Sequence, residues 1–223
     1  MTKHSKSKKH SLAKLADNWR ESIFSSIKSI HLKRAVAVLS ASGCRPAELE
    51  RGILVRLKAG ILSIGIHGSK VDEEAGRGQP LRLLDIDQET PWGRFLLEQV
   101  SVQPNFAIIV KYDAGGISQR LREKSRELWP RRKSLVSAYS YRHFIGKSMK
   151  ESGESSDKIA RVLGHATDFS QHSYGRVGGG KLNEGQHGVL HATSSNPIRH
   201  SHKSDRYLKF VRKVVIKKEM YRE

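Results

Sequence analysis

Two arginines, a histidine and a tyrosine stand in distinctive surroundings along the chain of 223 residues. Arg45 lies in the run GCRPAEL, and Arg142 lies 97 positions later in the run YSYRHF. His165 ends the run LGH, and Tyr174 follows nine positions after it. Guanidinium groups donate paired hydrogen bonds to phosphate oxygens and keep their charge, so such a set suits a phosphoryl centre without a metal. A tyrosine oxygen can attack that centre and store the phosphodiester energy in a covalent link.

The order and spacing of these runs resemble the tyrosine recombinase (phage-type integrase) family, over the length of that family's catalytic domain. GCRPAEL is similar to the first arginine box, and YSYRHF to the second, with Tyr139 at the usual histidine position. LGH followed by YGR is similar to the third box with its nucleophile. The resemblance covers roughly residues 32–176.

The resemblance implies a role for each catalytic position. Arg45 and Arg142 would hold the non-bridging oxygens of the scissile phosphate, and His165 would add a third hydrogen bond. Tyr174 would form the 3′-phosphotyrosyl link. The family also uses a lysine as general acid for the 5′-hydroxyl leaving group. In this sequence Lys70 is the first candidate for that role.

Four further residues have secondary roles in this interpretation. Lys58 is the weaker candidate for the general acid. Glu48, one helical turn after Arg45, is expected to hold that guanidinium. Tyr139 and His143 are expected to support the site beside Arg142, although tyrosine is a poor general base because its pKa is near 10.

The implied activity is that of a site-specific DNA recombinase or integrase of a mobile genetic element. It would act on duplex DNA as a homo-tetramer on paired sites, with no cofactor and no metal. Members of the family usually carry an N-terminal clamp domain, whereas 31 residues precede Leu32 here. An accessory DNA-binding protein is therefore a further expected partner. Two alternatives stay open: a non-catalytic or accessory DNA-binding protein derived from a recombinase, and a type IB topoisomerase-like enzyme.

The charge of the chain also points to a polyanion. Lys and Arg number 41 against 22 Asp and Glu, for a formal charge of +19. Residues 1–34 and 199–223 carry 13 of these 19 charges, as expected for arms that grip phosphates. No apolar run approaches the length of a membrane span, and no secretory signal is visible. With Cys44 as the single cysteine, we expect a cytoplasmic, nucleoid-associated protein and no membrane.

The elements that must position these residues follow from apolar periodicity. Residues 11–42 read as helical up to Gly43. Residues 53–58, 61–66 and 81–86 alternate as strands of an antiparallel meander, and 106–110 suit a short strand. Helical patterns resume at 91–97, 117–128, 142–152 and 156–163. The predicted fold class is α+β, mainly α-helical with a small three-stranded antiparallel sheet.

Four segments are expected along the chain. Residues 1–30 form a basic tail and leading helix, and 31–176 form the catalytic domain. Residues 177–204 are rich in Gly, Ser, His and Asn, which is typical of a flexible linker. Residues 205–223 form a basic C-terminal segment. The linker contains histidines but no carboxylate pattern beside them, so we expect no metal site at His187, His191, His200 and His202.

Overall fold

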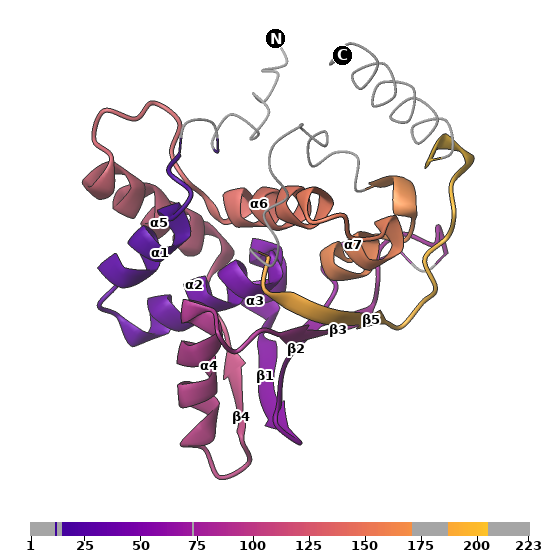
Figure 1. Cartoon of the computed structure of the whole chain (residues 1–223), viewed down its shortest axis with the longest axis horizontal. Coiled ribbons are helices and arrows are strands. Elements are labelled where there is room, and N and C mark those ends of the chain that lie inside the picture. The colour runs from indigo at the N-terminus through magenta and orange to yellow at the C-terminus, as the bar shows by residue number, and fades with distance from the viewer. Residues whose placement is uncertain (1–11, 13–14, 73, 171–186, 205–223) are drawn as a thin grey trace, which may run out of the picture.

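The part of the chain that the structure describes consists of an antiparallel sheet and a layer of helices (Figure 1). The computed structural model describes residues 12, 15–72, 74–170 and 187–204. Tyr174, the basic tail at 1–10 and the basic segment at 205–223 lie outside the described residues. The mixed α+β class predicted from the sequence is confirmed.

The predicted meander is present. Strands β1 (Ile53–Lys58), β2 (Ile61–His67) and β3 (Leu81–Ile86) pair in sequence order. Ala59 and Gly60 form the two-residue turn between β1 and β2, both with positive φ. This is the backbone that a tight hairpin with right-handed twist requires.

The prediction of three strands is wrong, because the sheet has five in the order β4-β1-β2-β3-β5. Strand β4 (Ala107–Val110) pairs with β1, which confirms the short strand expected at 106–110. Strand β5 (Val189–Ser194) pairs with β3 inside the segment predicted as a linker. As an edge strand it buries only Val189 and Ala192, so its apolar signal in the sequence is weak.

The predicted linker differs from the structure beyond β5 as well. After that strand the chain returns beside residues 166–170, where Thr167 and Arg199 form a parallel bridge. The Asp168 carboxylate accepts hydrogen bonds from the Ser201 backbone at 3.0 Å and the Ser204 hydroxyl at 2.8 Å. Polar bonds rather than apolar burial hold this segment, and the linker prediction is therefore wrong for residues 187–204.

The leading helical pattern is broken in two. Helix α1 (Trp19–Ser26) ends at Ile27, whose ψ of 119° is extended, and α2 (Ile30–Ser42) begins after Ser29. The Ser29 hydroxyl accepts from Leu32 N and caps α2. Gly43 ends α2 in the left-handed conformation, as predicted.

Helix α1 is anchored to the helical layer by a buried cation. Arg20 is 3% exposed, and its guanidinium carbon lies 4.1 Å from the Trp92 ring centroid and 3.9 Å from that of Phe144. Burial lowers the pKa of Arg20 to about 10, which leaves it charged at pH 7. Arg20 is therefore not one of the free charges expected of a basic tail.

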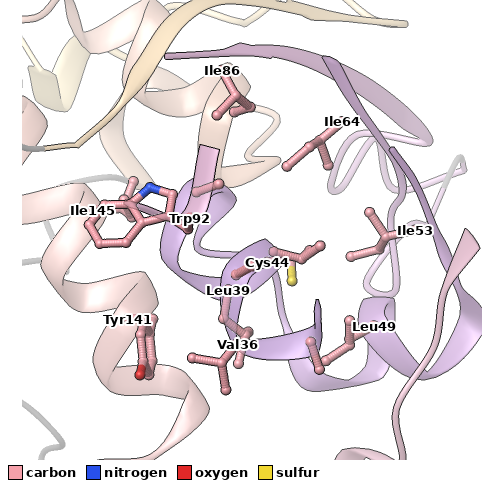
Figure 2. Close-up of a cluster of buried hydrophobic side chains, with 14 of the residues drawn as sticks. Val36, Leu39, Cys44, Leu49, Ile53, Ile64, Ile86, Trp92, Tyr141 and Ile145 are labelled. Carbon is pink, nitrogen blue, oxygen red and sulfur yellow. The ribbon is translucent and has the colours of Figure 1, made fainter. Parts of the chain in front are cut away.

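The remaining helices are α3 (Pro46–Arg51), α4 (Pro91–Ser101), α5 (Ala114–Leu128), α6 (Ala138–Glu151) and α7 (Ser156–Leu163). Apolar side chains from the helices and from the sheet meet in one core (Figure 2). Cys44 belongs to this core: burial raises the pKa of its thiol to about 12, so it stays a protonated, inert group. Within the described part of the chain, no helix is long and apolar enough to cross a membrane.

Candidate functional site

Arg45 is held at the start of α3 by its own helix. Its backbone N–H donates to Glu48 Oε2 at 2.7 Å, and its Nη1 donates to Oε1 of the same carboxylate at 2.7 Å. Pro46 at the first helical position pre-sets the turn that brings the two residues together. Glu48 therefore holds this guanidinium in the way the sequence predicts, while the Arg45 side chain stays 12% exposed.

A second arginine binds the same carboxylate from the sheet. Arg82 on β3 donates from Nη2 to Glu48 Oε2 at 2.7 Å and from Nη1 to Oε1 at 3.2 Å, and both side chains are fully buried. Burial alone would raise the pKa of Glu48, but the charges and hydrogen bonds of Arg82, together with the charge of Arg45, hold it well below its usual range. Glu48 is thus an ionised bridge between two guanidinium groups.

Sequence reasoning missed Arg82, although one signal was available. In the run LRLLDI, the residues at 82, 84 and 86 point to the core, and Leu84 and Ile86 are the apolar members of that face. A cation at such a position is rare unless it is paired. The pattern could have indicated a buried ion pair.

Arg142 lies on α6 beneath the site and is 1% exposed. Its Nη1 donates to Gly43 O at 3.1 Å, its Nη2 donates to Leu163 O, and the same Nη2 lies 3.2 Å from His165 Nε2. Gly43 allows this approach, because a Cβ there would lie 3.2 Å from Arg142 Cα and its φ is +59°. Arg142 therefore ties the first and third predicted boxes together.

His165 follows directly on the left-handed Gly164 that ends α7. A Cβ at Gly164 would lie 2.6 Å from Arg82 Nη1, so this glycine admits the buried arginine. His165 is 8% exposed. Burial and then the charges of Arg142 and Arg45 lower the pKa of His165 to about 2, so the imidazole is neutral at pH 7.

Arg45, Lys70 and His165 line one hollow of about 170 Å³, called here the small hollow. Lys70 is exposed and reaches it from the loop between β2 and β3. That loop is folded tightly, because a Cβ at Gly78 would lie 2.1 Å from Lys70 O. Lys58 lies instead at the β1–β2 turn, paired with Ile61, and is not among the residues that line the small hollow.

The structure thus brings together four of the five predicted catalytic positions: Arg45, Lys70 and His165 at the small hollow, with Arg142 beneath it. Tyr139 and His143 lie half-buried on α6, and neither lines the small hollow. The fifth position, Tyr174, lies outside the described residues.

Gln79 joins the Lys70 loop to the histidine loop and was also missed. It is 1% exposed, its Nε2 donates to His165 O at 3.2 Å, and its Oε1 accepts from Asn196 N at 3.0 Å. Both ends of this buried amide are therefore used. A glutamine has no sequence signal for such a role when its partners stand 86 and 117 positions away.

Two of the described histidines of the predicted linker have structural partners. His187 Nδ1 accepts from Val189 N at 3.1 Å, and His200 Nδ1 lies 2.6 Å from Asp168 Oδ2. Among the described residues, no group of three or more His, Cys, Asp or Glu side chains is placed to hold a metal ion.

Comparison with known proteins identifies the fold. No family model and no curated protein matches the sequence. Among solved structures, XerA recombinase matches with a TM-score of 0.55 and 17% identity, over 74% of this chain and 60% of that chain. A XerH site-specific recombinase bound to difH substrate, in a pre-cleavage complex, matches with a TM-score of 0.49 and 15% identity, over 72% and 48%. The likeness to XerA confirms the recombinase-like fold expected from the boxes.

Proposed function

We propose that this chain is a site-specific DNA recombinase that cuts and rejoins duplex DNA through a 3′-phosphotyrosyl intermediate at Tyr174. One observation carries the proposal: Arg45, Lys70 and His165, from three separate segments, line one hollow, with Arg142 in contact with His165. The recombinase-like fold supports it.

The charges at the small hollow suit a phosphoryl-transfer transition state. Arg45 and Lys70 line it as cations, and Arg142 adds its charge from beneath, where low solvent exposure weakens screening. Neutral His165 adds a polar ring to this set without a further positive charge. Preorganised donors of this kind stabilise the charge that develops on the phosphorus oxygens.

Protons are transferred at two oxygen atoms in the cleavage step. The Tyr174 oxygen attacks phosphorus and gives its proton to solvent water, and the bond from phosphorus to the 5′ oxygen breaks. Lys70 gives a proton to that leaving oxygen. Ser170 lines the small hollow, and the four-residue link from Ser170 to Tyr174 spans at most about 14 Å, a length suited to this attack. Rejoining reverses each transfer.

Assembly and biological context extend the proposal. The chain spans 60% of the XerA chain. We also propose that it acts on paired DNA sites as a homo-tetramer, with an accessory DNA-binding protein as a further partner. Integration or excision of a mobile element is the corresponding reaction.

Covalent trapping tests the proposal. The full chain is incubated with nicked suicide duplexes from the DNA that flanks its gene, and the products are separated under denaturing conditions. A protein–DNA adduct is expected for the wild type, and none for Tyr174→Phe, which keeps DNA binding. Binding without any adduct would instead support an accessory DNA-binding protein. Relaxation of supercoiled plasmid without a specific site would support a type IB topoisomerase-like enzyme.

A further inference from the structure

A second hollow of about 400 Å³, called here the large hollow, adjoins the small one. The two share a wall that consists of residues 76–78 from the Lys70 loop together with Ala166 and Arg199. Two exposed cations, Arg77 and Arg199, therefore line both hollows.

The Arg199 side chain is held in place. Its Nη2 donates to Gly76 O, and a Cβ at Gly76 would lie 3.2 Å from Arg199 Nη1. The backbone is fixed on both sides, because Arg199 N donates to Ala166 O at 2.9 Å and Arg199 O accepts from Asp168 N at 3.2 Å. A surface arginine in plain solvent has no such constraints, whereas a cation prepared for a ligand gains from them.

Arg77 is fixed through its backbone. Its N–H donates to Asp72 O at 2.7 Å, and its carbonyl accepts from Asp72 N at 3.0 Å, which closes the loop into a small hairpin. The two arginines thus reach the shared wall from segments more than a hundred positions apart in the sequence.

The two hollows differ in the charges of the side chains that line them. The charged side chains that line the small hollow are Arg45, Lys70, Arg77 and Arg199, with no carboxylate. The large hollow is lined by Asp72 as well as by Arg77 and Arg199. Asp72 Oδ1 accepts from Ala75 N at 2.9 Å, so that carboxylate belongs to the turn as well as to the lining.

We propose that Arg77 and Arg199 form a second phosphate-binding point, which holds the DNA phosphate next to the one cleaved. The inference rests on the proposed function, which places the cleaved phosphate in the small hollow. Each DNA strand carries a phosphate about every 3.4 Å along the helix axis, so a neighbouring phosphate falls beside the shared wall. The held guanidinium of Arg199 and the side chain of Arg77, whose backbone is fixed, would set the register of the strand before cleavage.

The salt dependence of binding tests this inference on a short duplex of fixed sequence. The double variant Arg77→Gln with Arg199→Gln is expected to lower the slope of log K against log salt by about 0.9, the loss of one phosphate contact. Arg94→Gln removes an exposed cation from α4, an element that lines neither hollow, and is expected to keep the slope. A wild-type slope in the double variant would overturn the inference.

Three further variants separate the effect of charge from the effect of structure. Arg199→Lys keeps the charge and is expected to keep most of the slope, whereas Arg77→Gln alone leaves the Arg199 contacts intact and is expected to lower it. Asp72→Asn retains the turn acceptor and removes the opposing charge, so tighter DNA binding is expected.

The outcome is independent of the trapping experiment, because binding needs no chemistry. If the wild type forms the adduct and the double variant keeps the wild-type salt slope, only the second phosphate-binding point is overturned. If the wild type forms no adduct and the double variant has a reduced salt slope, the proposed recombinase activity is overturned. Arg77 and Arg199 would still be phosphate ligands.

Discussion

Arg82 and Glu48 form a fully buried, doubly hydrogen-bonded ion pair directly behind Arg45, with N–O distances of 2.7 and 3.2 Å. The pair joins the inner face of β3 to helix α3. Because Glu48 also binds the Arg45 guanidinium, the position of one predicted catalytic residue depends on a cation of the sheet.

Replacement of Glu48 by Gln is expected to destabilise the fold by about 3–5 kcal/mol at pH 7, since two guanidinium groups lose their buried counter-charge. The folded-state pKa of Glu48 is lowered, so its contribution is present above the unfolded pKa of about 4.3 and declines as the pH falls below it. Urea unfolding should therefore show a difference between wild type and variant that narrows below about pH 4. Glu98→Gln, an exposed site on α4, serves as control; a pH-independent difference would contradict the assignment.

Arg82→Met tests the pair from the other side. Alone it leaves Arg45 as the ion-pair partner of Glu48 and is expected to destabilise the fold strongly. Combined with Glu48→Gln, the loss should be smaller than the sum of the single losses by about 1–3 kcal/mol, because the two residues interact directly. A double-mutant cycle by urea unfolding measures this coupling, and strict additivity would count against it.

Gln79→Leu keeps the size of the side chain but leaves His165 O and Asn196 N without their amide partner. Loss of these buried bonds is expected to cost about 1–3 kcal/mol in the free energy of unfolding. Cleavage should fall more than DNA binding, because the histidine loop shifts while the cations remain. Gln119→Leu, at an exposed site on α5, is the matched control; equal losses in binding and cleavage would argue against a positioning role.

His165 is expected to stay neutral throughout the physiological range, because burial and neighbouring cations lower its pKa to about 2. Its ring signals in NMR should show no titration step between pH 5 and 8. Cleavage should accordingly have no inflection in that range from His165. A step near pH 6.5 that disappears in His165→Gln would refute the neutral assignment.

Arg20→Met tests whether helix α1 is part of the domain. Removal of a desolvated cation between Trp92 and Phe144 is expected to cost roughly 2 kcal/mol. Lys28→Ala, at an exposed position after α1, should change stability little. If both variants unfold like the wild type in urea, α1 is not anchored as the contacts imply.

The predictions at Arg45, Arg142 and His165 rest on short runs of neighbouring residues in the sequence. Gly43 and Pro46 stand close to Arg45, and Gly164 precedes His165, so these two runs carry backbone requirements that can be recognised without the fold. Long-range partners could not be found in this way. Arg82 meets Glu48 across 34 positions, and Gln79 meets Asn196 across 117.

The edge strand β5 shows a second limit. The run VLHATS has a weak apolar pattern, and its neighbours favour turns, so composition alone indicated a linker. Pairing with β3 supplies what the pattern lacks. The break between α1 and α2 was missed for a related reason: the spacing of Ile23, Ile27 and Ile30 continues the helical period through Ile27, where the backbone is extended.

Strand β5 also links completion of the sheet to the order in which the chain is synthesised. A translation product that stopped between Tyr174 and Val189 would contain every predicted catalytic residue, yet the edge of β3 would be open and Gln79 would lack Asn196. Open strand edges pair with other chains, so such a product is expected to aggregate. A nascent chain would therefore complete its sheet only after Ser194 has left the ribosome, well after the last predicted catalytic codon has been read.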